Sequence, residues 1–183
     1  MKLAIISDLH DNIANLDIFL AWEKENPIDA LLCCGDTTFK ETLKHLAKNF
    51  SKSIYFVFGN ADTDREGLIR FASKFPNTNI LGETGRLIIA QNKIIIISSE
   101  TEKDQNSISL AFIHFPTEAK KLAESGFYDY VFYGHTHKPW LEKIGATNLV
   151  NPGTLGGVFY QPTFALLDLS TRQLSLKLLS QLI

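Results

Sequence analysis

Two histidines separated by one residue follow an apolar run in the second half of the sequence. The run is Tyr130–Tyr133, and Gly134, His135, Thr136 and His137 come directly after it. In extended backbone, residues two apart project to the same side, so both imidazoles are expected to face one point. A glycine before them removes a side chain where another group has to approach the backbone closely. Because imidazole is a common metal ligand, the pair predicts a metal site if other ligand-type residues reach it.

Ligand-type residues also follow other apolar runs, at the points where strands are expected to end. They are Asp8 and His10, Asp36 after Gly35, Asn60 after Gly59, and His114. In open α/β sheets, ligands bind at the carboxyl ends of the strands, because loops and helix amino-termini converge there. We therefore expect four of the five histidines, two aspartates and an asparagine to gather at one edge.

Seven nitrogen and oxygen ligands are more than one metal ion needs. They suit two divalent ions about 3.5–4 Å apart that share a carboxylate and a bridging water. Imidazole and carboxylate ligands without thiolate favour manganese, iron, zinc, nickel or cobalt. Hydrolysis of a phosphate ester is the chemistry that uses such a pair, since the ions neutralise phosphate oxygens and lower the pKa of the bridging water.

The first two-fifths of the chain is predicted to alternate strands and helices. Short apolar runs indicate buried strands, and helical spacing of apolar residues with capping-box patterns indicates the helices between them. The expected strands are 3–6, 30–34 and 54–58; the expected helices are one closed by Pro27 and two that begin in the capping boxes Thr38–Glu41 and Thr63–Glu66.

The second half is predicted to be richer in strands. Its elements are a hairpin over 87–90 and 94–97, a loop over 98–107, a strand over 110–113, a helix after Pro116, and strands over 163–169 and 173–179. A parallel α/β half followed by a strand-rich half favours an α/β fold with two sheets packed face to face and covered by helices.

Composition fits one domain spanning residues 1–183, with 45% hydrophobic and 21% charged residues. The net charge of −2 argues against nucleic acid and anionic membranes as partners. No apolar run is long enough to span a membrane, and Asp8 follows the apolar amino terminus too early for a signal peptide, so a cytoplasmic location is expected. Adjacent Cys33 and Cys34 are expected to be buried thiols rather than a disulfide.

The ligand motifs resemble those of the calcineurin-like metallophosphoesterases, in the same order along the chain. The match is closest to the small single-domain phosphodiesterase branch, which includes the phosphoesterase-fold subunit of retromer. It covers residues 8 to 137, and the turn 151–154 resembles the Asn-Pro-Gly-Ser turn of that branch. Each short motif alone is weak, because loop, cap and turn roles explain single residues. Five motifs in order are specific.

The resemblance implies a four-layer α/β/β/α sandwich with two packed mixed sheets and the metal site at the carboxyl ends of strands. It also implies two divalent metal ions, manganese first, with nickel, zinc, iron, cobalt or magnesium as alternatives. By motif, Asp8, His10, Asp36 and His137 would hold one ion. Asp36, Asn60, His114 and His135 would hold the other, with Asp36 bridging. The two histidines of the opening pair are thereby assigned to different ions.

Two departures from the family pattern affect the chemistry. Many relatives have a histidine after the Gly-Asn pair, where it can protonate the leaving group, and this chain has Ala61. The missing acid is worth about 10²–10⁴ in rate. Asp62 keeps the branch's aspartate, but near two cations it should stay ionised and be a poor acid. His114 is followed by Phe115 and Pro116 instead of Gly-His, which makes the wall beside it apolar.

Candidate substrate contacts are fewer. Asn60, Asn12 and Thr154 are predicted to touch substrate phosphate, although Asn12 and Thr154 could instead stabilise their turns. Trp140, Phe159 and Tyr160 could stack on a base or aryl group, but packing in the core or at a sheet edge is favoured. His45 is expected to be a surface residue.

The predicted function is a metal-dependent phosphoesterase that hydrolyses a small phosphodiester, or a monoester, through a hydroxide activated by two metal ions. The alternative is a low-activity, metal-binding scaffold on the same fold, as the retromer subunit suggests. A nuclease is a third hypothesis, which no basic stripe supports. A small phosphate ester is the expected partner, and a homo-oligomer is left open.

Overall fold

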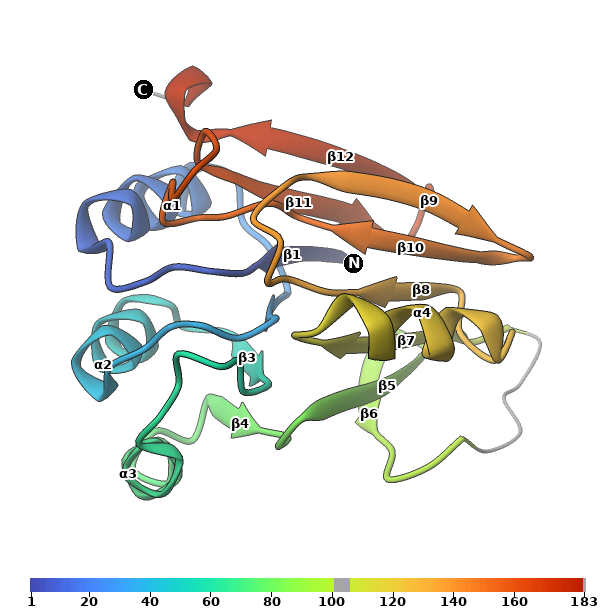
Figure 1. Ribbon diagram of the computed structural model, residues 1–183, viewed down its shortest axis with the longest axis horizontal. Helices are drawn as coiled ribbons and strands as arrows, with labels where there is room; N and C mark the ends of the chain where they lie inside the picture. Colours follow the sequence, from blue (N-terminus) through green and yellow to red (C-terminus); the bar gives the residue numbers. More distant parts are fainter. Residues whose placement is uncertain (101–105, 183) are drawn as a thin grey trace.

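The computed structural model describes residues 1–100 and 106–182, whose strands form two sheets of six strands each (Figure 1). The first sheet has, in spatial order, β12 (Gln173–Leu178), β11 (Thr163–Asp168), β1 (Lys2–Ile6), β2 (Ala30–Cys33), β3 (Ser53–Phe56) and β4 (Thr78–Ile80). The second has β6 (Lys93–Ile96), β5 (Thr84–Ala90), β7 (Ile108–Ile113), β8 (Tyr130–Phe132), β10 (Thr147–Asn151) and β9 (Trp140–Ile144).

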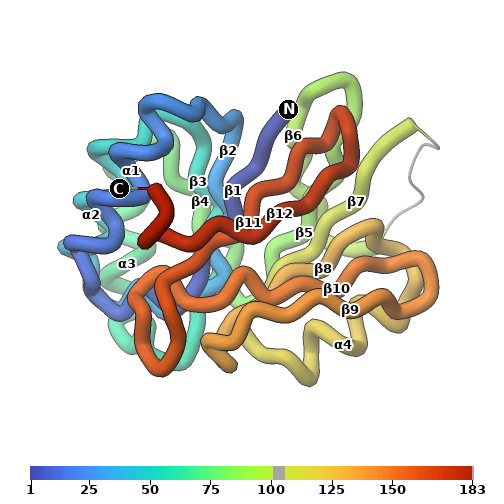
Figure 2. Tube along the Cα trace, turned by 90° about the horizontal axis from the view of Figure 1, so that it is seen from above, coloured from blue at the N-terminus to red at the C-terminus, as the bar shows by residue number. Residues whose placement is uncertain are grey.

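Helices cover the outer faces of both sheets. Three of them, α1 (Ile13–Glu25), α2 (Lys40–Asn49) and α3 (Arg65–Ala72), lie on one side of the molecule, and α4 (Pro116–Glu124) lies on the other side (Figure 2). A 3₁₀ helix, η1 (Leu179–Gln181), follows β12 and contacts α1. In the part of the chain that the structure describes, no helix is long and apolar enough to cross a membrane.

Three hydrophobic clusters separate the four layers. Alternate residues of β1 point to opposite faces, so Ala4 and Ile6 pack with the helices α1 to α3 while Leu3 and Ile5 face the second sheet. The third cluster joins α4 to the outer face of the second sheet, with Val131 and Ala119 at its centre. Because β1 to β3 are buried on both faces, their sequences are continuous apolar runs.

Both sheets are mixed, and their parallel parts direct the site residues to one place. In the first sheet β1, β2, β3 and β4 are parallel, and in the second β7, β8 and β10 are parallel. Strand β1 is central, because it pairs with β2 on one edge and with antiparallel β11 on the other. The loops after β1, β2 and β3 therefore meet the loops after β7 and β8 across the two sheets.

The architecture confirms the expected α/β/β/α sandwich and most of the expected elements. The hairpin of β5 and β6 and the start of α4 at Pro116 also agree with the sequence. Strands β4, β9 and β10 had not been assigned individually. The predicted loop over 98–107 includes residues 101–105, which lie outside the described residues.

Both capping-box predictions are wrong. Helix α2 has Phe39 at its N-cap without a side-chain hydrogen bond, and the hydroxyl of Thr38 has no partner among the described atoms. Helix α3 is capped by Asp64, whose carboxylate accepts from the backbone N–H of Gly67, and not by Thr63. A carboxylate is an equally good cap one residue later, so the spacing alone could not separate the two.

Candidate metal centre

The seven predicted ligands lie in the loops that follow β1, β2, β3, β7 and β8, and α1 begins only after the first of these loops. Two groups of side chains have ligand atoms within 4.8 Å of one another: Asp8, His10 and His137, and Asp8, Asp36 and His114. The first group joins the loop after β1 to the loop after β8, 127 residues later in the chain.

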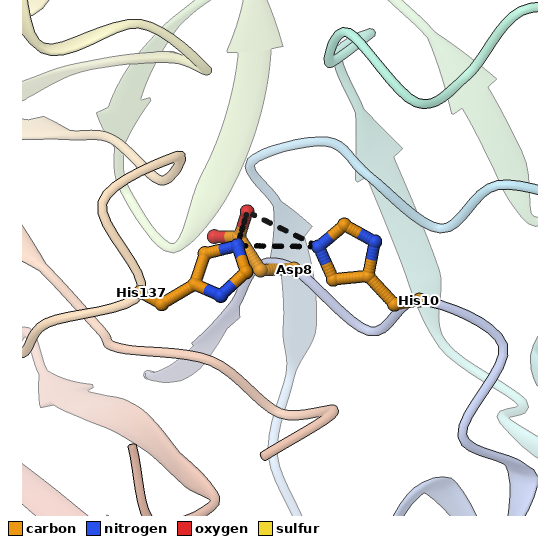
Figure 3. A group of neighbouring side chains, drawn as sticks. All are labelled: Asp8, His10 and His137. Atoms are coloured by element: carbon orange, nitrogen blue, oxygen red, sulfur yellow. Dashed lines mark hydrogen bonds and ion pairs between the residues drawn. The ribbon is translucent and has the colours of Figure 1, made fainter. Parts of the chain in front are cut away.

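In the first group, two imidazoles face one carboxylate (Figure 3). The Nε2 atoms of His10 and His137 are 3.2 Å apart, and Oδ1 of Asp8 lies 3.2 Å from Nε2 of His137 and 3.9 Å from Nε2 of His10. Three electronegative atoms converge on one point in this arrangement. A cation or a proton is needed there, because two nitrogen lone pairs repel each other when nothing lies between them.

The second group is extended by an amide and a third imidazole. Nε2 of His114 is 3.4 Å from Oδ2 of Asp36 and 3.1 Å from Oδ1 of Asn60. The same Asn60 oxygen is 2.9 Å from Nδ1 of His135. Asp36 also approaches the first group, since its Oδ2 is 3.8 Å from Nε2 of His10. Both Asp8 and Asp36 thus reach both groups of ligands.

Unusual backbone conformations orient these side chains. Asp8, His10, Asp36, His135 and His137 all have positive φ. For residues other than glycine this conformation costs about 1–2 kcal/mol and is concentrated at functional sites. The extended backbone that was expected for His135 and His137 is therefore wrong. Their rings enter different groups, His137 beside Asp8 and His135 beside Asn60.

Two glycines allow the loops to approach the carboxylates. A Cβ atom at position 134 would lie 1.9 Å from Oγ of Ser7 and 2.7 Å from Oδ2 of Asp8. A Cβ atom at position 59 would lie 2.1 Å from Oδ1 of Asp36. The close approach expected at Gly134 is confirmed, and Gly59 has the same role in the second group.

The carboxylates of the site are buried, and histidines are their basic neighbours in place of lysine or arginine. Asp8, Asp36 and Asp62 are at most 1% exposed, and among the described residues none of them forms an ion pair with lysine or arginine. Buried charges in proteins are paired or coordinate metals. The histidines are the nearby groups that can carry a proton or bind a cation.

Charge coupling between these groups shifts their pKa values. Burial alone would raise the pKa of Asp36, but the hydrogen bond and charge of His114 and the N–H of Ala61 outweigh it, so this pKa is lowered. Burial opposes protonation of His114, but Asp36 and the charge of Asp8 raise its pKa. The hydrogen bond to Asp8 raises the pKa of His137. The raised pKa values favour protonation of His114 and His137 in the metal-free protein.

The donor set fits divalent metal ions. It provides imidazole nitrogens and carboxylate and amide oxygens without thiolate, because Cys33 and Cys34 are buried free thiols, with the pKa of Cys33 raised by burial to about 12. Nδ1 of His114 donates to the carbonyl of Cys34 at 2.8 Å, and Nδ1 of His137 donates to that of Val158 at 3.1 Å. These bonds leave each Nε2 free to bind a metal ion.

Asp62 has a different surrounding from the ligands. Its Oδ2 accepts from the backbone N–H groups of Asp36 and Gly59, and its Oδ1 accepts from that of Thr38, each at 2.8 Å. Burial raises the pKa of Asp62, in spite of these three donors. The carboxylate therefore joins the loops after β2 and β3, which carry Asp36 and Asn60. This geometry gives Asp62 a positioning role and adds to the argument against Asp62 as a catalytic acid.

Asn12 and Thr154 are both occupied by structural hydrogen bonds. Asn12 caps α1 through its Oδ1 and donates to the carbonyl of Gly156. Thr154 is fully buried, and its hydroxyl donates to the carbonyl of Asp8 and accepts from Gly157. Their prediction as substrate contacts is not supported by these bonds.

The sequence reasoning missed two backbone carbonyls that orient candidate ligands, those of Cys34 beside His114 and Val158 beside His137. Backbone groups leave no signal in residue types.

The aromatic residues near the motifs differ in their distance from the candidate ligands and in their exposure to solvent. Trp140 has the Nζ atom of Lys138 over its ring and lines an apolar groove between β9 and β12 that includes none of the predicted ligands. Phe115 contacts the rings of His114 and His135, with centroids 5.1 Å apart in each case. Phe159 is 89% exposed and its ring centroid is 5.6 Å from that of His137. Core packing is therefore wrong for Phe159.

Comparisons with known proteins identify a matching family and a related phosphodiesterase. A profile of the calcineurin-like phosphoesterase superfamily domain matches residues 1–172. Phosphodiesterase MJ0936 of Methanocaldococcus jannaschii is 25% identical over 174 residues, which are 94% of this chain and 96% of the relative.

Solved structures share the fold at lower identity. A novel archaeal phosphodiesterase has a TM-score of 0.81 at 22% identity, covering 97% of this chain and 99% of its own. Zinc-bound Vps29 of Entamoeba histolytica has a TM-score of 0.61 at 19% identity, covering 97% and 96%. The Escherichia coli phosphoesterase YfcE has a TM-score of 0.62 at 16% identity, covering 98% and 100%.

Proposed function

The chain belongs to the calcineurin-like phosphoesterase superfamily, and from that membership we propose that it hydrolyses a small phosphodiester, or a phosphomonoester, with two divalent metal ions. One observation carries the proposal. Buried carboxylates and imidazoles form two adjacent groups, and among the described residues no lysine or arginine forms an ion pair with these carboxylates. The phosphodiesterase from Methanocaldococcus jannaschii supports a phosphodiester as the substrate class.

The ligand sets follow from the two groups and from the family's motifs. Asp8, His10 and His137 would hold one ion with Asp36; His114, Asn60 and His135 would hold the other with Asp36. When bound, such ions supply positive charge for phosphate oxygens and lower the pKa of a water molecule. Manganese is the ion we expect first.

The chain's own residues limit which leaving groups can depart easily. Ala61 occupies the position where many relatives have a histidine, and its N–H donates to Oδ1 of Asp36 at 2.7 Å. Its methyl group has no proton to give. Asp62 cannot replace the histidine, because both of its oxygens accept backbone hydrogen bonds. We therefore expect aryl phosphodiesters, whose leaving groups need no protonation, to react faster than alkyl phosphodiesters.

Replacement of one ligand tests the proposal directly. His135→Ala should abolish metal-stimulated hydrolysis of bis(p-nitrophenyl) phosphate, assayed with manganese, zinc, nickel, cobalt and magnesium in turn. His45→Ala is the matched control, since His45 lies on α2 and its ring bonds to Asp17 at 2.6 Å, outside both ligand groups. Undiminished hydrolysis by the His135 variant would refute the assignment of the site.

A second candidate is a metal-binding scaffold with little turnover. Two observations favour it: Ala61 removes an acid, and Vps29 has the same fold and was crystallised with zinc. A panel of aryl and alkyl phosphates tests this candidate. If the wild-type protein binds metal tightly but hydrolyses no ester of the panel, the scaffold function is favoured. The single-domain organisation, the cytoplasmic location and the oligomeric state stay predictions.

A further inference from the structure

Phe159 has a position that folding alone does not explain. Its side chain is 89% exposed, so it contributes almost nothing to the core. Its φ is +65°, a conformation that is a rare outlier for a bulky residue. An exposed aromatic ring on strained backbone beside a candidate metal ligand is the combination expected of a residue that contacts a ligand.

The segment that carries Phe159 is fixed to the metal site. Leu155 N donates to Ser7 O at 2.9 Å, and Gly156 N donates to Asp8 O at 3.0 Å. Val158, the residue before the phenylalanine, accepts the hydrogen bond of His137 Nδ1. The ring of Phe159 lies beyond this bond, tilted by 35° against the ring of His137. The backbone on its amino-terminal side is thus held by the same loops that hold the first group of ligands.

We propose that Phe159 forms one wall of a subsite for a planar aromatic group, an aryl ring or a nucleobase, carried by the phosphoester. The proposal rests on the proposed phosphoesterase function, because it places the phosphate at the two ligand groups. An aromatic group attached to that phosphate can then lie against the exposed face of Phe159. Stacked aromatic pairs favour binding by about five- to tenfold.

Tyr160 and Trp140 help to define the limits of the subsite. Tyr160 is 45% exposed and follows Phe159 directly, so it is a second exposed aromatic side chain on the same segment. Trp140 is 50% exposed but lines the groove between β9 and β12. It therefore provides an exposed aromatic side chain outside the proposed subsite, and its replacement is a matched control.

Binding of paired ligands that differ only in an aromatic ring tests the proposal. Phenylphosphonate and methylphosphonate are titrated by calorimetry into the manganese-loaded protein. We expect Phe159→Ala to weaken phenylphosphonate binding about five- to tenfold, with less than about twofold change for methylphosphonate. Phe159→Tyr should restore the preference, and Trp140→Ala should leave it unchanged. Equal weakening of both ligands, no weakening of either, or no phosphonate binding to the wild-type protein would overturn the proposal.

Two further measurements show whether the aromatic group is a nucleobase or an aryl ring, and separate failure of the subsite from failure of the proposed function. Titration with AMP and ribose 5-phosphate shows whether a nucleobase gains from Phe159 as a phenyl ring does; a gain for either ring supports the subsite. Hydrolysis of bis(p-nitrophenyl) phosphate is measured on the same samples. Aromatic preference without hydrolysis means that the proposed function fails and the subsite stands. Hydrolysis without aromatic preference means that the subsite fails and the function stands.

Discussion

Replacing Asp62 with asparagine should weaken the hydrogen bonds that position the metal site while leaving every candidate ligand side chain unchanged. The carboxylate accepts from three backbone N–H groups, two on Oδ2 and one on Oδ1. An asparagine has one acceptor oxygen and one NH₂ group, and NH₂ cannot accept a hydrogen bond. The best arrangement keeps the oxygen toward Asp36 and Gly59. The N–H of Thr38 then faces another donor.

The magnitude follows from that single lost acceptor. A buried donor left without a partner costs about 1–3 kcal/mol. Burial raises the pKa of Asp62, so removing the charge recovers part of the desolvation cost and brings the expected loss to about 2 kcal/mol. For a chain of 183 residues this corresponds to a decrease in melting temperature of about 4–8 °C. Because Asp36 and Asn60 lie on the loops that Asp62 joins, metal affinity should fall about 10–100-fold.

Urea unfolding of the metal-free protein and a metal titration measure the two effects. Asp64→Asn is the control, because Asp64 caps α3 with one accepted hydrogen bond and asparagine is an equally good cap. If Asp62→Asn keeps both stability and metal affinity but slows only esters with poor leaving groups, the residue acts as an acid. That result would refute the positioning role derived from the three hydrogen bonds.

Three further predictions concern metal, protons and leaving groups. Manganese at 100 times its dissociation constant should stabilise the protein by about 2.7 kcal/mol, and a scan without rise in melting temperature contradicts the site. The raised pKa values of His114 and His137 stabilise the metal-free protein fully below pH 6.5, and this contribution is lost as pH rises through the folded-state values. Metal affinity should show the opposite trend, rising with pH as those imidazoles lose their protons; parallel trends would exclude the coupling. Ala61→His should speed hydrolysis of alkyl phosphodiesters by up to about 10² while changing aryl esters little, as initial rates with both esters would show.

The strands, and the candidate ligands that follow them, could be located from the sequence because their signals are local. Runs such as Leu3–Ile6 are apolar on both faces, and Asp8 and Asp36 lie within three residues of the ends of such strands. The division of the candidate ligands between two ions came from the family's motifs. The conformation of His135 and His137 could not be predicted, because positive φ is imposed by neighbouring loops, including the contact of Gly134 with Ser7.

Roles that depend on contacts between residues far apart in the sequence could not be predicted. Asp62 accepts a hydrogen bond from the backbone N–H of Asp36, which lies 26 residues away in the sequence. The residue type alone does not show whether an aspartate is a buried hydrogen-bond acceptor or a catalytic acid. Phe159 was expected to pack because apolar residues usually do, yet the turn that carries it presents its ring to solvent beside His137. In both cases tertiary contacts decided the role, and the sequence contains no periodic pattern that reports them.

The position of β1 between β2 and β11 has a consequence for synthesis of the chain. Residues 2–5 of β1 pair with residues 165–168 of β11, so this edge of β1 stays unpaired until residues 165–168 have left the ribosome. An apolar strand with a free edge is a template for aggregation. We expect chaperones to bind nascent chains that end before β11 and to release chains that include it, which can be measured by co-purification with stalled ribosomes.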